Sequence, residues 1–463
     1  MNGRSGNRRF PLLLFAYVAG HVGDILYISL MVIHLKRTTG STLIAALFPF
    51  VRVLAMFGSS FVSPLLLERL PLVRLLALTR AGETAALLAL AGAVALGVEA
   101  PAALLAFVLV ISMLQGWTDP VVYALVARLT PAAGLARANA ALGTAREVGA
   151  IAAWGVGGVL AALLEPAWML AGTALLFAAG FAAALRLAPA IAAAGPHAAV
   201  GAAGGAGAGA AGAAQAEAPA AAPPAPAAAP AAAQAEPGTA ASGASAPSRR
   251  EAIRLGWREL FRSPAARAVV AMDLLEGIAI SIFAGVFTLT FVERQLGQEE
   301  AFWGFLNAAY FVGMIAGGAL AARLSRHLMR RLPLALAFGS FGYGVGTLLY
   351  GATTSPLAAL LLIAGLGLPC MVRETAQRTL LQLNVPERAL PNALVAHGAI
   401  NALAFALSLL LMGAAAERFG IQSIYYIGGA LGLASAALGL ALFARHRAAV
   451  KLPAEPGAAS EQA

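Results

Sequence analysis

Charged side chains interrupt several of the long apolar stretches in this sequence. The set comprises Asp24, Arg52, Arg80, Glu83, Asp119, Arg146, Glu147, Asp273, Glu276, Arg373 and Glu374. If these stretches cross a membrane, each charge costs at least about 2.5–3.5 kcal/mol near the bilayer centre. A residue kept at that cost is a candidate for binding, proton transfer or ion pairing.

Carboxyl groups in an apolar cavity can take up and release a proton near neutral pH, as proton-driven chemistry requires. Asp24, Asp119, Glu276 and Glu374 are the candidates for such proton coupling, because the family resemblance described below implies that their four helices line the cavity. Asp24 lies about half-way along the first apolar stretch, where a direct role and a structural partnership with Arg52 carry equal weight. Glu276 follows Asp273 by three residues, so these two either share a site or mark the inner end of their helix.

Arg52 lies about ten residues into the second apolar stretch, where an unpaired guanidinium is not expected. Its candidate partners are Asp24 and Asp119. A special role in the first half of the chain and a structural ion pair remain equal alternatives for Arg52. Arg80 and Glu83 are three residues apart on one helical face and are expected to pair with each other.

Two further charge pairs are expected to gate the inner mouth of a transport path. They are Arg146 with Glu147, and Arg373 with Glu374. His21 and His397 are expected to be hydrogen-bonded packing residues, since nothing around them is typical of a metal site. The single cysteine, Cys370, lies in an apolar stretch, which excludes a disulfide or a cysteine metal site. We find no phosphate-binding loop, zinc motif or catalytic triad, so an enzyme is not expected.

The composition requires a membrane environment for the elements that position these residues. The chain has 463 residues, of which 60% are hydrophobic and 11% are charged, against about 45–50% and about 25% in a soluble domain. Apolar stretches of about 20 residues, enough to cross a bilayer as a helix, occur in two groups of six. They lie near residues 11–33, 43–66, 72–97, 101–127, 140–163 and 166–187, then 268–291, 303–324, 332–352, 356–381, 393–415 and 423–444.

Basic residues gather in alternate connections between these stretches, which predicts that both termini are cytoplasmic. The basic connections contain Arg69 and Arg74, Arg128 and Arg137, Arg249 to Arg262, Arg323 to Arg331, Arg378 and Arg388, and Arg445 and Arg447. Membrane topology therefore explains the net charge of +10 better than nucleic-acid binding does. The predicted location is the inner membrane of a bacterium.

The sequence divides into two six-helix halves joined by a linker. Residues 1–187 form the first half, and residues 188–248, rich in Ala, Gly and Pro, form a flexible cytoplasmic linker. Residues 249–447 form the second half, which starts with a basic segment that is either an amphipathic helix on the anionic leaflet or a solvated connector. Residues 448–463 form a cytoplasmic tail.

A shift of 255 residues aligns the two halves and indicates an internal repeat. Phe50 then meets Phe305, Gly58 meets Gly313, Pro131 meets Pro386, and Asp119 meets Glu374. Arg52 meets the neutral residue Asn307, so the two halves differ at this position. Parallel six-helix repeats are a known plan of transporters, with the binding site between them near the bilayer midplane.

Three incomplete motifs resemble the major facilitator superfamily. The connection after the second stretch, Pro64-Leu65-Leu66-Leu67-Glu68-Arg69 with Arg74, resembles the loop that latches one conformation in that family, and Arg323 ends a weaker copy. Gln115-Gly116 resembles part of the helix-4 motif of family exporters but lacks its Arg, for which Asp119, Arg52 or Arg146 could substitute. Gly149, Gly157 and Gly158 resemble the glycines of the helix-5 antiporter motif, although Trp154 replaces its Pro.

The segment from Leu135 to Ala140 is similar to the loop before helix 5 in the family's macrolide and siderophore exporters. Together these resemblances imply a proton-coupled exporter of amphipathic or lipophilic small molecules, working as a monomer without a cofactor beyond the proton gradient. Two alternatives remain. One is uptake or exchange of an anionic metabolite bound by Arg52, and the other is a membrane sensor or scaffold that does not transport.

Overall fold

A computed structural model of the chain describes residues 9–130, 132–192, 249–323, 331–386 and 389–445, and every regular element within these ranges is a helix. Ten helical segments there are long and apolar enough to cross a membrane, and a bent pair of helices adds an eleventh. The predicted all-helical membrane architecture is confirmed. The count of twelve crossings, the position of the termini and the domain limits stay predictions, and most of the predicted linker and tail lies outside the described residues.

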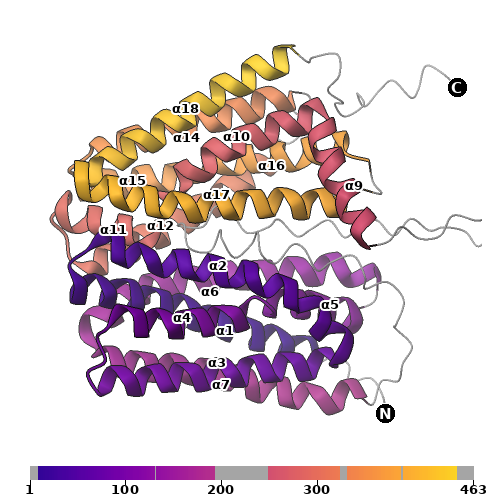
Figure 1. Cartoon of the computed structure of the whole chain (residues 1–463), viewed down its shortest axis with the longest axis vertical. Coiled ribbons are helices and arrows are strands. Elements are labelled where there is room, and N and C mark those ends of the chain that lie inside the picture. The colour runs from indigo at the N-terminus through magenta and orange to yellow at the C-terminus, as the bar shows by residue number, and fades with distance from the viewer. Residues whose placement is uncertain (1–8, 131, 193–248, 324–330, 387–388, 446–463) are drawn as a thin grey trace, which may run out of the picture.

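The described part of the first half contains seven helices, which run roughly side by side (Figure 1). They are α1 (Arg9–Thr39), α2 (Thr42–Arg69), α3 (Leu72–Ala95), α4 (Pro101–Gln115), α5 (Thr118–Leu129), α6 (Ala132–Leu163) and α7 (Pro166–Ala192). The segment from Leu135 to Ala140, predicted to be a loop, belongs to α6, which therefore begins eight residues before the predicted start at 140. Because this segment is rich in Ala, it favours a helix even though it is not strongly hydrophobic.

The second half has the same arrangement, preceded by a short helix across one end (Figure 1). Its helices are α9 (Arg249–Arg262), α10 (Pro264–Ser281), α11 (Gly285–Arg294), α12 (Glu300–Arg323), α14 (Leu332–Ala352), α15 (Pro356–Gly365), α16 (Gly367–Asn384), α17 (Leu390–Phe419) and α18 (Ile421–Arg445).

Three apolar stretches that the sequence predicts as continuous are each divided into two helices. The breaks separate α4 from α5, α10 from α11 with a bend of 46°, and α15 from α16. Glycines at these breaks allow close contact with a neighbouring helix. A Cβ on Gly116 would lie 1.7 Å from Ser59 Oγ of α2, and a Cβ on Gly367 would lie 2.2 Å from the Gly313 carbonyl carbon of α12.

The two halves meet mainly along two helix pairs, α6 with α12 and α2 with α17, with smaller contacts of α11 with α1 and α2. Trp154 and Trp303 pack edge to face across the first pair, with ring centroids 5.3 Å apart. Small residues bring these helices together, since a Cβ on Gly304 would lie 2.5 Å from the Trp154 carbonyl oxygen.

Among the described side chains, the hydrophobic core joins the two halves at one end of the bundle and is divided between them at the other. One buried cluster includes residues of both halves, among them Tyr27, Trp154, Phe287 and Trp303. The other two clusters each belong to a single half. We call the end where these two separate clusters lie the linker end, because Ala192 and Arg249 border the linker there, and we call the opposite end the joined end. Arg9 of α1 and Arg445 of α18 also lie at the linker end (Figure 1).

Candidate functional site

Asp24, Arg52 and Gln115 form a closed hydrogen-bonded cluster in the first half. The Arg52 guanidinium donates from Nη1 to Asp24 Oδ1 at 2.9 Å and from Nη2 to Asp24 Oδ2 at 2.6 Å. Gln115 connects both residues, accepting from Arg52 Nη1 at 2.6 Å and donating to Asp24 Oδ1 at 2.6 Å. The three side chains come from α1, α2 and α4, so this first-half cluster ties three helices together.

The first-half cluster is charge-balanced and largely closed to solvent. The Arg52 side chain is 1% exposed, whereas the Asp24 side chain is 13% exposed and is the accessible part of the cluster. Two-point pairing of this kind is the strong form of an ion pair. Of the two partners that the sequence offered for Arg52, the structure selects Asp24.

Gln115 belongs to the helix-4 motif, which in this chain lacks the Arg of the family pattern. Ser112 stands where the family motif has that Arg, and Arg52 of α2 supplies a guanidinium to Gln115 instead. The sequence suggested Arg52 as one substitute among three but gave no role to Gln115 itself.

Asp119 lies in a second group, near the start of α5. The Tyr17 side chain makes a hydrogen bond with its carboxyl group, and Arg146 lies within electrostatic range. Arg146 in turn donates to Glu147 at 3.0 Å, so that predicted pair forms. These neighbours of Asp119 come from α1 and α6.

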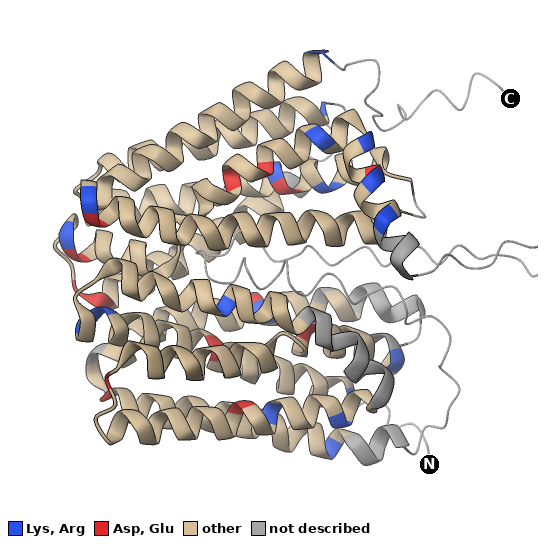
Figure 2. Ribbon diagram, in the orientation of Figure 1, with Lys and Arg blue, Asp and Glu red and all other residues tan. Residues whose placement is uncertain are grey.

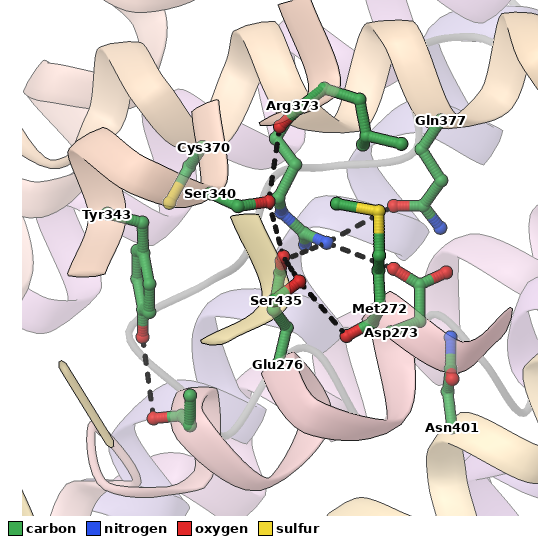
Figure 3. Close-up of polar contacts among 12 residues, drawn as sticks. Met272, Asp273, Glu276, Ser340, Tyr343, Cys370, Arg373, Gln377, Asn401 and Ser435 are labelled. Carbon is green, nitrogen blue, oxygen red and sulfur yellow. Dashed lines mark hydrogen bonds and ion pairs between the residues drawn. The ribbon is translucent and has the colours of Figure 1, made fainter. Parts of the chain in front are cut away.

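Glu276 lies at the centre of a buried polar cluster in the second half (Figure 3). Its Oε1 accepts hydrogen bonds from Ser340 Oγ at 2.5 Å and Ser435 Oγ at 2.6 Å. Its Oε2 lies 2.5 Å from Arg373 Nη1. The partners come from α14, α18 and α16, and neither serine was predicted from the sequence.

The same cluster contains Asp273 and His397. Asp273 Oδ1 accepts from Arg373 Nη1 at 3.1 Å, and Asp273 Oδ2 lies 2.6 Å from His397 Nε2. Asp273 and Glu276 therefore share a site, one of the two alternatives left open. We call Asp273, Glu276, Ser340, Arg373, His397 and Ser435 the second-half cluster.

Arg373 does not pair with Glu374, the partner predicted for it at an inner gate. It points to Asp273 and Glu276, whereas Glu374 pairs with Arg378 one turn along α16. Neighbouring residues on a helix project in different directions, which separates the two side chains. Arg80 and Glu83 do pair as predicted, at 2.8 Å, and Asn307 is a buried side chain that donates to the Trp303 carbonyl.

The motif residues of the expected conformational latch are only partly described. Arg74 and Arg323 are exposed at helix ends, while the side chains of Glu68 and Arg69 lie outside the described residues. The helix-5 glycines have clear packing roles. Cβ atoms on Gly149 and Gly157 would contact Val22 and Ser29 of α1 at 3.1 Å, and one on Gly158 would lie 3.1 Å from the Glu300 carbonyl oxygen of α12.

Polar contacts that were not predicted from the sequence connect the two halves at the joined end. Lys36 Nζ donates to Thr42 and to Thr290, both at 2.7 Å. Glu417 of α17 accepts from Ser41 Oγ at 2.5 Å and from the Leu43 amide at 3.0 Å, at the N-terminus of α2. These joined-end contacts, together with the pair Arg37–Glu300, link α1 and α2 to α11, α12 and α17.

Charged residues are concentrated at the two ends of the bundle, with a few inside it (Figure 2). The interior charges are those of the first-half cluster, the second-half cluster and the pairs described above. Within the described ranges, no group of three or more His, Cys, Asp or Glu side chains has the arrangement of a metal site.

Matches to known proteins cover nearly the whole chain. The Major Facilitator Superfamily profile matches residues 13–390 and 269–461. An uncharacterized MFS-type transporter of Bacillus subtilis (strain 168), YfmI, is 26% identical over 429 residues, covering 92% of this chain and 94% of that protein. A second one from the same organism, YjbB, is 30% identical over 188 residues, covering 41% of this chain and 46% of that protein.

Solved transporter structures share the fold at low identity. A POT family transporter in complex with a thioalcohol-conjugated peptide superposes with a TM-score of 0.68 at 11% identity, covering 96% of this chain and 97% of that one. A bacterial homologue of the iron transporter ferroportin superposes with a TM-score of 0.66 at 15% identity, covering 94% and 98%. The chain therefore belongs to the Major Facilitator Superfamily and is a multi-pass membrane transporter.

Proposed function

We propose that this transporter is a proton-coupled exporter of amphipathic or lipophilic small molecules in the bacterial inner membrane. The observation that carries the proposal is the first-half cluster, in which a part-exposed Asp24 carboxylate is held by a buried Arg52. Protonation of Asp24 would remove the charge that binds the guanidinium, and the three helices would then be free to rearrange. The proton gradient supplies the energy, no cofactor is required, and the transporter works as a monomer.

Alternating access is supported by the way the halves pack. The core is continuous at the joined end and divided at the linker end, as expected for a transporter open on one side of the membrane. The linker end carries exposed Arg74, Arg254, Arg258, Arg323 and Arg445. The positive-inside rule assigns that end to the cytoplasm, so this conformation would receive its substrate from the cell interior.

The two alternative functions have less support. An anion held by Arg52 would need access to a guanidinium that is 1% exposed and bonded to Asp24 through both terminal nitrogens. A sensor or scaffold would not need buried charges on several helices, since each one costs insertion energy.

Dye efflux from cells expressing the protein tests the proposal, with and without a proton uncoupler. We expect efflux that stops on uncoupling and that is lost in Asp24→Asn, while the exposed-loop variant Glu99→Gln stays at the wild-type level. Efflux that ignores the uncoupler, or persists in Asp24→Asn, would contradict the proposed coupling. Ligand binding without any transport in proteoliposomes would indicate the sensor.

A further inference from the structure

The second-half cluster contains more acid than base. It has two carboxyl groups, Asp273 and Glu276, whose side chains are 3% and 5% exposed, and one guanidinium, Arg373, which is 14% exposed. With His397 neutral, the cluster carries one uncompensated negative charge. Burial of an uncompensated charge in a membrane protein is expensive, and such a group takes up a proton instead.

Other interior charge groups do not combine the same features. Asp24 with Arg52 and Arg80 with Glu83 are balanced pairs. The group of Asp119, Arg146 and Glu147 also has two acids and one base, but Asp119 is only part-buried.

Hydrogen bonding within the second-half cluster indicates where a proton would reside. Glu276 has three donors, from Ser340, Ser435 and Arg373, which suit an ionised carboxylate. Asp273 Oδ2 has His397 Nε2 as its partner at 2.6 Å, and His397 Nε2 also lies 3.3 Å from Asn401 Nδ2. This contact allows one proton to be held between the imidazole and the carboxylate.

The remaining charged groups on the helices around this pair do not balance it. Among the described residues, Glu374 pairs with Arg378 on α16, and Glu259 pairs with Arg258 and Arg262 on α9. The other charged side chains on these helices are exposed, lie at the far end of α17, or pair with Asp24. These side chains are Arg254, Arg267, Arg445, Glu417, Arg418 and Arg52.

We infer that Asp273 and His397 hold one exchangeable proton between them, and that this pair is a second proton site of the transporter. The proton comes from water and is bound either as Asp273 carboxylate with His397 imidazolium or as Asp273 carboxylic acid with neutral His397. No other bond changes, and the cluster charge goes from −1 to zero. The inference rests on the proposed proton-coupled function for its role in transport, but not for the existence of the site.

The site is placed where its protonation can reach the interface between the halves. Asp273 belongs to α10 and His397 to α17, and α17 packs against α2 of the first half. Loss of the proton leaves neutral His397 on α17 beside the Asp273 carboxylate on α10, so the attraction between these two helices weakens and their separation is favoured. The protonation state would therefore affect the position of α17, one of the helices through which the two halves contact each other.

The test measures the proton directly in the full-length protein, labelled with ¹⁵N-histidine and placed in lipid nanodiscs. NMR spectra between about pH 5 and about pH 8 report the imidazolium, with His397→Gln identifying its signal, and infrared spectra report a protonated carboxyl group. We expect one of these two signals to titrate in wild type and to be lost in Asp273→Asn, which leaves Glu276 and Arg373 balanced. Asp24→Asn should retain it.

The outcomes separate this inference from the proposed function. If neither signal is present in wild type, or if both are unchanged in Asp273→Asn, the second proton site is refuted. If the proton signal is present but dye efflux ignores the uncoupler, the site stands and the proposed coupling fails. If both hold, Asp273→Asn in proteoliposomes should stop uphill efflux driven by a pH gradient and keep downhill exchange.

Discussion

Arg37 of α1 and Glu300 of α12 form a two-point ion pair across the two halves at the joined end. Arg37 Nε donates to Glu300 Oε1 at 2.6 Å, and Arg37 Nη2 contacts the other carboxylate oxygen. The Arg37 side chain is 51% exposed, so the pair itself contributes only about 0.2–1 kcal/mol. A contact this weak can be broken once in every transport cycle, provided that the joined end has to open.

A covalent cross-link in place of this pair should arrest transport. In the double variant Arg37→Cys with Glu300→Cys, a bifunctional thiol reagent that spans the length of the two original side chains would lock the joined end, because Arg37 and Glu300 meet there. With a reagent that attaches through reducible disulfides, we expect efflux to fall to background on cross-linking and to return on reduction. Each single variant treated with the same reagent is the control, and full efflux by a verified cross-linked protein would show that the joined end need not open.

The charged residues of both clusters were identified from the sequence, but only some of their partners were. Arg52 had two candidate acids, and an unpaired Arg was too costly, so its pairing with Asp24 was within reach. Ser340 and Ser435 had no signal, because a lone serine in an apolar helix is common and only the fold brings α14 and α18 to Glu276.

The joined-end contacts were missed for a different reason. In the sequence, Lys36, Arg37 and Glu300 fall between the predicted apolar stretches, where charges are normally explained by topology and hydration. Their function as contacts between halves depends on which connections meet in space, and neither hydropathy nor the 255-residue repeat contains that information. The helix breaks were equally hidden, since apolar content continues across Gly116 and Leu366.

Removing one partner of the first-half cluster should destabilise the protein more than removing both. Arg52→Gln leaves the Asp24 carboxylate without its counter-charge, a change that typically costs about 3–5 kcal/mol for a buried pair. The double variant Asp24→Asn with Arg52→Gln has no charge to compensate, so its Tm in detergent should lie above that of Arg52→Gln alone. Arg294→Gln at an exposed position is the control. Additive losses in Tm would show that the two residues do not act as a pair.

A side chain at Gly304 should separate α6 from α12. The new Cβ of Gly304→Ala would lie 2.5 Å from the Trp154 carbonyl oxygen, which forces the backbone to move. Such overpacking costs about 1–3 kcal/mol, and we expect a lower Tm together with reduced efflux. Gly172→Ala on α7 is a matched control, because its Cβ would meet nothing within 4 Å. Equal behaviour of the two variants would contradict the close contact.

Helix α9 should bind anionic lipid through one face. Arg254, Trp257, Arg258, Phe261 and Arg262 are exposed and recur at helical spacing, with Trp257 and Phe261 stacked at 6.2 Å. The opposite face is held against the second half, since Leu260 is fully buried and a Cβ on Gly256 would lie 2.5 Å from Asn392 of α17. A basic and aromatic face on a fixed helix is typical of an anionic membrane surface.

The lipid prediction is tested by the Tm of full-length protein in nanodiscs with and without phosphatidylglycerol. Wild type should gain stability from the anionic lipid, because headgroup charge near each Arg is worth about 1 kcal/mol. The triple variant Arg254→Gln, Arg258→Gln and Arg262→Gln should lose most of that gain, whereas Arg294→Gln and Arg418→Gln at the joined end should keep it. If the triple variant responds to the lipid as wild type does, α9 is a solvated connector and the aromatic pair on its surface has no membrane role.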